Sequence, residues 1–163
     1  MRIATWNVNS MKARLPRVVP WLEEHEPDVL CLQETKQADD AFDPTPLESL
    51  GYEVAHHGDG RWNGVAIASR VGLDEVTRGF DGPSDATGPR LVAATCGGVR
   101  VHSVYVPNGR ELTSEWYPLK LAWLEELRDL LAPRCASGGE VVVAGDFNVA
   151  PSDLDVWDPA ALE

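Results

Sequence analysis

Residues 140–149 read EVVVAGDFNV. This stretch begins with a short apolar run, Val141 to Ala144, which is typical of a buried strand. The run ends at Gly145–Asn148, where polar side chains replace apolar ones. In open α/β sheets, ligands bind outside the carboxyl ends of the strands. The end of this strand therefore predicts a functional site.

The same pattern recurs along the chain, with helices between the strands. Short segments rich in β-branched or aromatic residues predict strands over 2–8, 28–33, 52–55, 64–69, 91–96, 99–106 and 140–144. Gly97–Gly98 predicts a hairpin turn between two of them. Helical spacing predicts helices over 15–24 and 114–131 and a short one near 46–50, with Pro16 in a first turn that Pro20 distorts. This order indicates an α/β layered fold with a mixed sheet.

Composition limits the class of protein. A length of 163 residues suits one domain. The sequence contains no run of about 18 apolar residues, so we expect no membrane span. No long apolar stretch follows Arg2, so we expect no secretory signal. The odd count and wide spacing of Cys31, Cys96 and Cys135 favour reduced thiols and a cytoplasmic location over disulfides or a zinc site.

The net charge of −12 argues against a protein with a broadly basic, nucleic-acid-binding face. The charges are unevenly distributed, however, because residues 1–22 contain four bases and no acid. Residues 135–163 contain six acids and no base. One end of the molecule can therefore be locally positive, while most of the acids serve solubility.

Polar residues follow four of the predicted strands at the point where each strand ends: Asn7 and Asn9, Glu34, Tyr105 and Asn108, and Asp146 and Asn148. Carboxylate and amide oxygens suit Mg²⁺ or Mn²⁺, and Mg²⁺ typically takes only one or two protein carboxylates plus waters. Amide and hydroxyl donors beside such a cation suit a phosphoryl group. Each residue alone is more simply a turn residue, but the set together favours a phosphoryl-transfer site.

The histidines indicate no catalytic arrangement. His56 and His57 are adjacent and would face opposite sides of a strand, and His25 suits the end of a helix. We therefore interpret all four histidines, His102 included, as structural or surface residues. The chain also contains no phosphate-binding glycine motif and no Ser/His/Asp arrangement.

Several segments together resemble the bacterial exonuclease III family of the endonuclease/exonuclease/phosphatase superfamily. They are RIATWNVNSMKAR, DVLCLQETK, RWNGVAIASR, VYVPNGRE, YPLKLAWLEELRDLL and VVAGDFNVAPSDLDVWDP. The resemblance implies a Mg²⁺-dependent DNA-repair hydrolase. Such an enzyme cuts double-stranded DNA at abasic sites and removes nucleotides or blocking groups from 3′ ends.

The resemblance also implies roles for the polar strand ends. Glu34 corresponds to the principal metal carboxylate, with Asn7 as the amide beside the metal and phosphate. Tyr105 corresponds to a phosphate-contacting tyrosine. Asp146 is similar to the residue that activates water or protonates the leaving group, and Asn148 is similar to its phosphate-orienting partner. Asp146 and Asn148 are also expected near the metal.

Two further residues are expected to bind substrate. Asn108 would hold the DNA backbone. Asn9 lies where some relatives carry an acid, so substrate rather than metal is its predicted partner.

The resemblance covers about three-fifths of a family member. Residues 1–163 are therefore expected to form the N-terminal part of a four-layer α/β sandwich, with two mixed sheets flanked by helices and the second sheet largely missing. The exposed inner sheet face would then promote self-association. The terminal Ser-Asp-His motif of the family is not in this chain. A nuclease that is inactive as this chain, a non-catalytic or partner-binding fragment, and another phosphodiesterase or phosphatase of the superfamily are the alternatives.

Overall fold

A computed structural model describes residues 1–158 of the chain. The last residues of the predicted domain, 159–163, lie outside the described part. The elements in chain order are β1 (Ile3–Asn7), α1 (Met11–His25), β2 (Val29–Gln33), α2 (Thr45–Glu48), β3 (Glu53–His57), β4 (Val65–Ser69), β5 (Asp74–Arg78), η1 (Pro83–Thr87), β6 (Leu91–Cys96), β7 (Val99–Tyr105), α3 (Trp116–Ala136), β8 (Val141–Asp146) and η2 (Asp153–Asp155).

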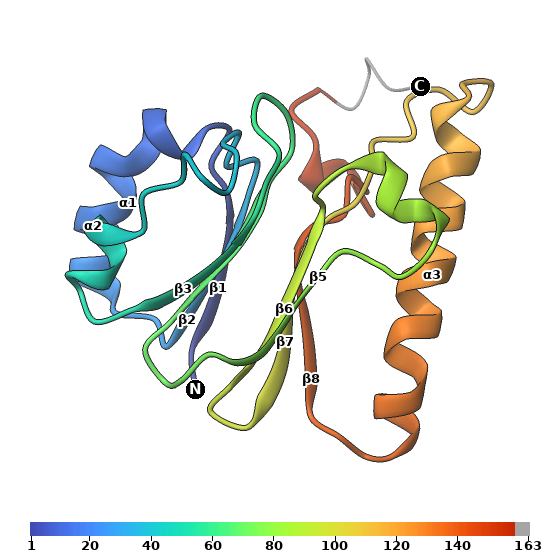
Figure 1. The fold of residues 1–163 in the computed structure, drawn as a ribbon. Helices are drawn as coiled ribbons and strands as arrows, with labels where there is room; N and C mark the ends of the chain where they lie inside the picture. The colour runs from blue at the N-terminus through green and yellow to red at the C-terminus, as the bar shows by residue number, and fades with distance from the viewer. Residues whose placement is uncertain (159–163) are drawn as a thin grey trace.

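The strands form two four-stranded sheets, ordered β1-β2-β4-β3 and β5-β6-β7-β8. Each sheet is mixed: β1 is parallel to β2, and β7 is parallel to β8, whereas the other neighbours are antiparallel. Helices α1 and α2 cover the outer face of the first sheet, and α3 covers the outer face of the second (Figure 1). The predicted sandwich of two mixed sheets flanked by helices is confirmed.

The second sheet is not largely missing, and on this point the prediction was wrong. The hairpin of β6 and β7 turns at Gly97–Gly98, as predicted, and pairs with β5 and β8 to form a sheet of its own. Strand β5 has the sequence DEVTR, whose exposed polar residues gave no strand signal. The second sheet therefore has four strands among the described residues.

The inner faces of the two sheets pack against each other. Cys31 and Ile67 of the first sheet share a buried cluster with Val92 and Val101 of the second, and all four are 0% exposed. The expected exposed inner face is therefore buried, because the second sheet covers it.

A buried pair of side chains, Gln33 and Ser103, makes hydrogen bonds across this largely apolar interface. Towards its edge, Arg78 of β5 also donates to the His56 carbonyl of β3 at 2.7 Å, and His57 Nδ1 lies 3.1 Å from the Leu91 carbonyl. The side-chain amide of Gln33, at the end of β2, donates to the hydroxyl of Ser103 on β7 at 3.2 Å. Ser103 in turn donates to the backbone carbonyl of Leu32, and the Gln33 side-chain oxygen accepts from Thr5. Gln33 and Ser103 are almost fully buried, so each has a partner where solvent could not supply one.

Helix α1 begins at Met11, four residues before the predicted start. Ser10 provides the cap, since its hydroxyl accepts from the backbone N–H of Ala13 at 3.4 Å. Pro16 and Pro20 consequently lie inside the helix. The buried side chains Val18 and Leu22 hold this helix on the sheet despite the backbone hydrogen bonds that the two prolines cannot make.

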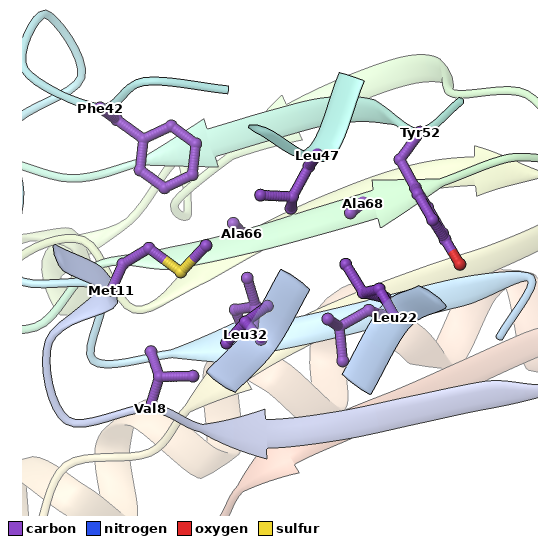
Figure 2. Packing of buried hydrophobic residues seen from close by; sticks show 11 residues of the cluster. Val8, Met11, Leu22, Leu32, Phe42, Leu47, Tyr52, Ala66 and Ala68 are labelled. Atoms are coloured by element: carbon purple, nitrogen blue, oxygen red, sulfur yellow. The ribbon is translucent and has the colours of Figure 1, made fainter. Parts of the chain in front are cut away.

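The outer apolar clusters attach the helices to the sheets. Figure 2 shows Leu22 of α1 and Leu47 of α2 over Leu32 of β2 and Ala66 of β4. On the other side, Trp123 of α3 packs with residues of β6 and β7 and edge-to-face against Phe80. Within residues 1–158, none of the helices combines the length and apolar character needed to cross a membrane.

Candidate active site

Four strands from two sheets bring their polar carboxyl ends to one place. Asn7 ends β1 beside Gln33 of β2, and Glu34 follows directly. Tyr105 ends β7 beside Asp146, the last residue of β8. Each pair of parallel strands thus places polar residues side by side at its carboxyl end. The packing of the two sheets then brings these two sets of residues together.

The amide of Asn7 links the two carboxylates. Its Nδ2 donates to Glu34 Oε1 at 2.8 Å and to Asp146 Oδ2 at 2.8 Å. Glu34 comes from the first sheet and Asp146 from the second, 112 residues later in the chain. The contact therefore brings one oxygen of each carboxylate close to a single nitrogen atom.

Glu34 is held by an unusual turn. Glu34 and Lys36 both have left-handed backbone, with φ of 54° each. The turn is fixed by neighbours: the N–H groups of Thr35 and Lys36 donate to the carbonyls of Gly64 and Asn63, and the Glu34 carbonyl accepts from Ser10. A β-carbon at Gly64 would collide with the Thr35 hydroxyl, so only glycine allows this approach.

A buried hydrogen-bond chain supports the same turn. His56 Nε2 lies 2.8 Å from the Thr35 hydroxyl, and its Nδ1 lies 2.7 Å from Asp39 Oδ1. Thr35 is 0% exposed and His56 is stacked against Phe42. Burial lowers the pKa of His56, opposed by the bond to Asp39. His56 is thus a structural residue, as predicted, although one placed directly behind Glu34.

The local electrostatics keep Glu34 ionised. Burial alone would raise the pKa of its carboxyl, but hydrogen bonds from Asn7, Lys36 and Tyr105 outweigh burial and lower it. Lys36 Nζ lies 2.9 Å from Glu34 Oε2. The site therefore presents a carboxylate, with an ammonium group beside it, at neutral pH.

Tyr105 faces the Glu34 carboxylate and keeps its proton. Burial, followed by the negative charge of Glu34, raises the pKa of Tyr105 to about 12. The guanidinium of Arg90 lies 4.7 Å from the centre of the tyrosine ring. The phenol is therefore a hydrogen-bond donor with a fixed positive charge on its face.

The loop after β8 fixes Asp146 and Asn148. The Asn148 N–H donates to Asp146 Oδ1 at 2.9 Å, and the Asn148 amide donates to the Val106 carbonyl at 2.8 Å. Lys120, which is 8% exposed, reaches from α3 and donates to the Asn148 carbonyl at 2.6 Å. The two site residues are thereby held together at the strand end.

Gly145 explains why the valine run stops where it does. A β-carbon at this position would collide with the Val104 carbonyl on the neighbouring strand. The close approach of β8 to β7 places Asp146 directly beside Tyr105. Glycine is therefore required one residue before the site.

The remaining predicted residues lie at the margin. Asn9 is exposed, and its side-chain oxygen accepts from the Lys36 ammonium. Asn108 is also exposed, and its side-chain oxygen accepts from the Arg110 N–H at 2.8 Å. Five of the predicted residues therefore lie together at the strand ends: Asn7, Glu34, Tyr105, Asp146 and Asn148. Asn9 contacts this group through Lys36. The side-chain contact of Asn108 is within its own turn.

Sequence reasoning missed three basic residues of this region: Lys36, Arg90 and Lys120. Lys36 lies two residues after Glu34 at the same strand end, so its position in the sequence could have identified it. Arg90 precedes β6 and Lys120 lies within a helix otherwise interpreted as core, so their proximity arises only from tertiary packing.

A cavity of about 810 Å³ adjoins the site through Arg90. Two tryptophans line it, and each carries an arginine over its ring: Arg61 over Trp62 at 5.4 Å and Arg110 over Trp116 at 4.7 Å. Trp62 is 64% exposed. Aromatic faces and guanidinium groups thus flank the acidic cluster, although the chain as a whole is acidic.

Comparison with known proteins identifies relatives along the whole chain. The chain is 32% identical over 161 residues to exodeoxyribonuclease III of Haemophilus influenzae, which covers 96% of this chain and 60% of that protein. It resembles the structure of an AP endonuclease from Archaeoglobus fulgidus, with a TM-score of 0.91, 41% identity and coverage of 99% of this chain and 63% of that one. It also resembles the 3′ phosphatase NExo from Neisseria bound to a product DNA hairpin, with a TM-score of 0.92, 39% identity and coverage of 100% and 63%.

The chain therefore spans about three-fifths of the length of these relatives. The profile of the endonuclease/exonuclease/phosphatase family matches residues 4–163, which include Asn7, Glu34, Tyr105, Asp146 and Asn148. The chain belongs to the endonuclease/exonuclease/phosphatase family.

Proposed function

We propose that this chain carries part of the active site of a Mg²⁺-dependent DNA-repair nuclease of the exonuclease III type. The observation that carries the proposal is the Asn7 amide, which brings the Glu34 and Asp146 carboxylates together at the ends of two sheets. The substrates would be the abasic sites and 3′ ends of double-stranded DNA. Support comes from relatives named as an exodeoxyribonuclease, an AP endonuclease and a 3′ phosphatase bound to DNA.

The residues present fit a magnesium ion. Glu34 is ionised and hydrogen-bonded, and the oxygen atoms of Glu34 and Asp146 converge on one amide. No cluster of three or more His, Cys, Asp or Glu side chains occurs in residues 1–158. Two carboxylates with waters are nonetheless a usual protein ligand set for Mg²⁺, and Mn²⁺ takes the same donors. Glu34 and Asp146 would hold the ion, with the Asn7 and Asn148 side chains beside it.

The bound ion would neutralise charge on the phosphoryl group. The residues of the chain supply the remaining functions. The Tyr105 hydroxyl, which retains its proton, would turn that proton from Glu34 to a phosphoryl oxygen when substrate binds. The second N–H of the Asn148 amide, beyond the one given to Val106, orients the same group. Asp146 accepts the proton of the attacking water or returns one to the leaving oxygen.

The aromatic and basic cavity suits the DNA strand next to the cut. Trp62 and Trp116 offer ring faces on which bases can stack, and Arg90 and Arg110 offer charge for phosphates. Local positive charge of this kind can act on DNA despite the net charge of −12.

Residues 1–163 are proposed to be one incomplete domain of a cytoplasmic protein. The buried thiols of Cys31 and Cys96 and the exposed thiol of Cys135 are all unpaired, which supports a reducing compartment. Because catalytic groups that act as a unit are strongly non-additive, we expect this chain alone to be inactive without the family's terminal Ser-Asp-His motif.

The test is cleavage of an abasic-site duplex in Mg²⁺, with an EDTA control. The chain alone is compared with a form extended by the C-terminal part of a relative, and with that form carrying Asp146→Asn. Asp153→Asn, the same change at an exposed residue, is the matched control. We expect EDTA-sensitive cleavage only in the extended form and its Asp153→Asn variant. Full activity of the Asp146→Asn variant would refute the assignment of the site.

A further inference from the structure

A second polar cavity lies far from the active site, between α3 and the outer face of the second sheet. Its volume is about 240 Å³. Arg78 of β5, Arg100 and His102 of β7, and Arg134 near the end of α3 supply its polar lining. Arg100 stands near the start of β7, whereas Tyr105 of the active site ends that strand. The cavity is therefore at the opposite end of the sheet.

The positive charge in this cavity has little compensation. Among the side chains that the structure describes, no carboxylate lies within 4.0 Å of a guanidinium nitrogen of Arg100 or Arg134. Arg100 donates to the Glu75 carbonyl and the Thr77 hydroxyl, both neutral groups. Asp81 is the one acidic residue among those that line the cavity. Arg78 borders the cavity, but its Nε donates to the His56 carbonyl of the first sheet at 2.7 Å. The guanidinium groups of Arg100 and Arg134 are therefore the charges that act on His102, with Glu75 as the nearest charge favourable to Arg100.

Two buried polar atoms of the lining have no hydrogen-bond partner in the structure. They are Nδ1 of His102 and Nε of Arg134. His102 is 5% exposed, so bulk solvent does not reach its ring freely. Buried polar atoms are nearly always hydrogen-bonded, and these two orphans belong to side chains that line the same cavity. A polar ligand in the cavity would satisfy them.

We propose that this cavity binds a phosphate group, either as the free ion or as part of a phosphomonoester. Guanidinium groups match the oxygens of phosphate in charge and in planar donor geometry. A water molecule occupies about 30 Å³ of the liquid, so a cavity of about 240 Å³ holds such an oxyanion together with a few waters. This site is separate from the proposed nuclease function and does not depend on it.

The state of His102 is consistent with a ligand of this charge. Burial first, and then the charges of Arg100 and Arg134, lower the pKa of His102 to about 4. A phosphate dianion between the same groups opposes both arginines and favours the imidazolium. Binding should therefore raise the pKa of His102, which a ligand that merely fills space would not do.

The experiment follows the His102 ring by NMR while the 163-residue chain is titrated with inorganic phosphate, and separately with 2′-deoxyadenosine 5′-monophosphate. Arg100→Gln and Arg134→Gln are the test variants. Arg128→Gln, on the exposed face of α3, is the control for the loss of one charge. Thermal unfolding with and without phosphate verifies that each variant is folded and gives a second measure of binding.

We expect saturable shifts of the His102 signals, a raised His102 pKa, and at least tenfold weaker binding in both test variants but not in Arg128→Gln. Tighter binding of the nucleotide than of inorganic phosphate would identify a phosphomonoester as the ligand. The proposal is overturned if neither compound shifts His102, or if all three arginine variants weaken binding equally. A folded Arg100→Gln variant with unchanged affinity would also overturn it.

Discussion

At the scale of single residues, the site depends on groups whose protonation is fixed by their neighbours. Tyr105 is the clearest case, because burial and the Glu34 charge raise its pKa to about 12 from the ordinary value of 10.0. The folded chain therefore holds this proton more tightly than the unfolded chain does. Its contribution to the free energy of unfolding is complete below pH 10 and is lost as the pH rises towards 12.

We predict that Tyr105→Phe removes a phenol ionisation near pH 12 from an ultraviolet titration of the folded chain. The variant should also show a smaller fall in the free energy of unfolding between pH 10 and 12. Tyr117→Phe is the matched control, since it removes a phenol outside the acidic cluster. If Tyr105→Phe instead removes a phenol ionisation near pH 10, Tyr105 does not lie buried beside the Glu34 carboxylate.

Glu34 supports a second prediction at this scale. Glu34→Gln keeps the shape of the side chain but removes its charge, so Mn²⁺ affinity measured by calorimetry should fall at least tenfold. Affinity in the unaltered chain should itself be weak, because two carboxylates are a small ligand set. Glu23→Gln, at an exposed position on α1, should bind like the unaltered chain. Equal affinities in Glu34→Gln and the unaltered chain would place the ion elsewhere.

At the scale of elements, the sequence predicted what local pattern controls and missed what tertiary packing controls. Seven of the eight strands appear as apolar or β-branched segments, whereas the polar edge strand β5 does not. The start of α1 was missed because Ser10 and the Glu34 turn, rather than Pro16, set it. The polar residues that meet at the four strand ends could be identified from their positions in the sequence. Lys120 and Arg90 could not, because only the packing of distant elements brings them there.

The junction of β7 and β8 gives a prediction for one element pair. Gly145→Ala should destabilise the chain by about 1–3 kcal/mol, the usual cost of an extra methyl group in a packed region, because the new β-carbon collides with the Val104 carbonyl. Gly138→Ala is the comparison: its β-carbon meets nothing within 4 Å, so only its backbone conformation opposes the change. Urea unfolding measures both. Equal stability of the two variants would mean that β8 lies farther from β7 than described.

For the chain as a whole, the two sheets pack face to face and enclose a buried apolar interior. The expectation of an exposed inner face came from assigning most of the second sheet to sequence outside this chain. Self-association therefore stays a prediction, but the inner sheet face that was expected to cause it is buried.

The buried interface gives a stability prediction. Ile67→Ala, in the middle of the sandwich, should lower the free energy of unfolding by about 2–5 kcal/mol through the cavity it leaves. Leu154→Ala is the control, since Leu154 is 96% exposed and its loss should matter little. Chemical denaturation tests both. A small effect of Ile67→Ala would indicate that the two sheets are not in contact.

The Gln33–Ser103 contact has a consequence for how the molecule tolerates change. Apolar contacts specify the register of two packed sheets less strictly than polar ones do, and a shift of register would carry Glu34 away from Asp146. The polar pair resists this motion, because any displacement strands a buried amide and a buried hydroxyl. Gln33 ends β2 directly before Glu34, and Ser103 lies on β7 two residues before Tyr105. Apolar positions of the sandwich can therefore vary during evolution while the spacing of Glu34 and Asp146 stays constant, provided that this pair is kept.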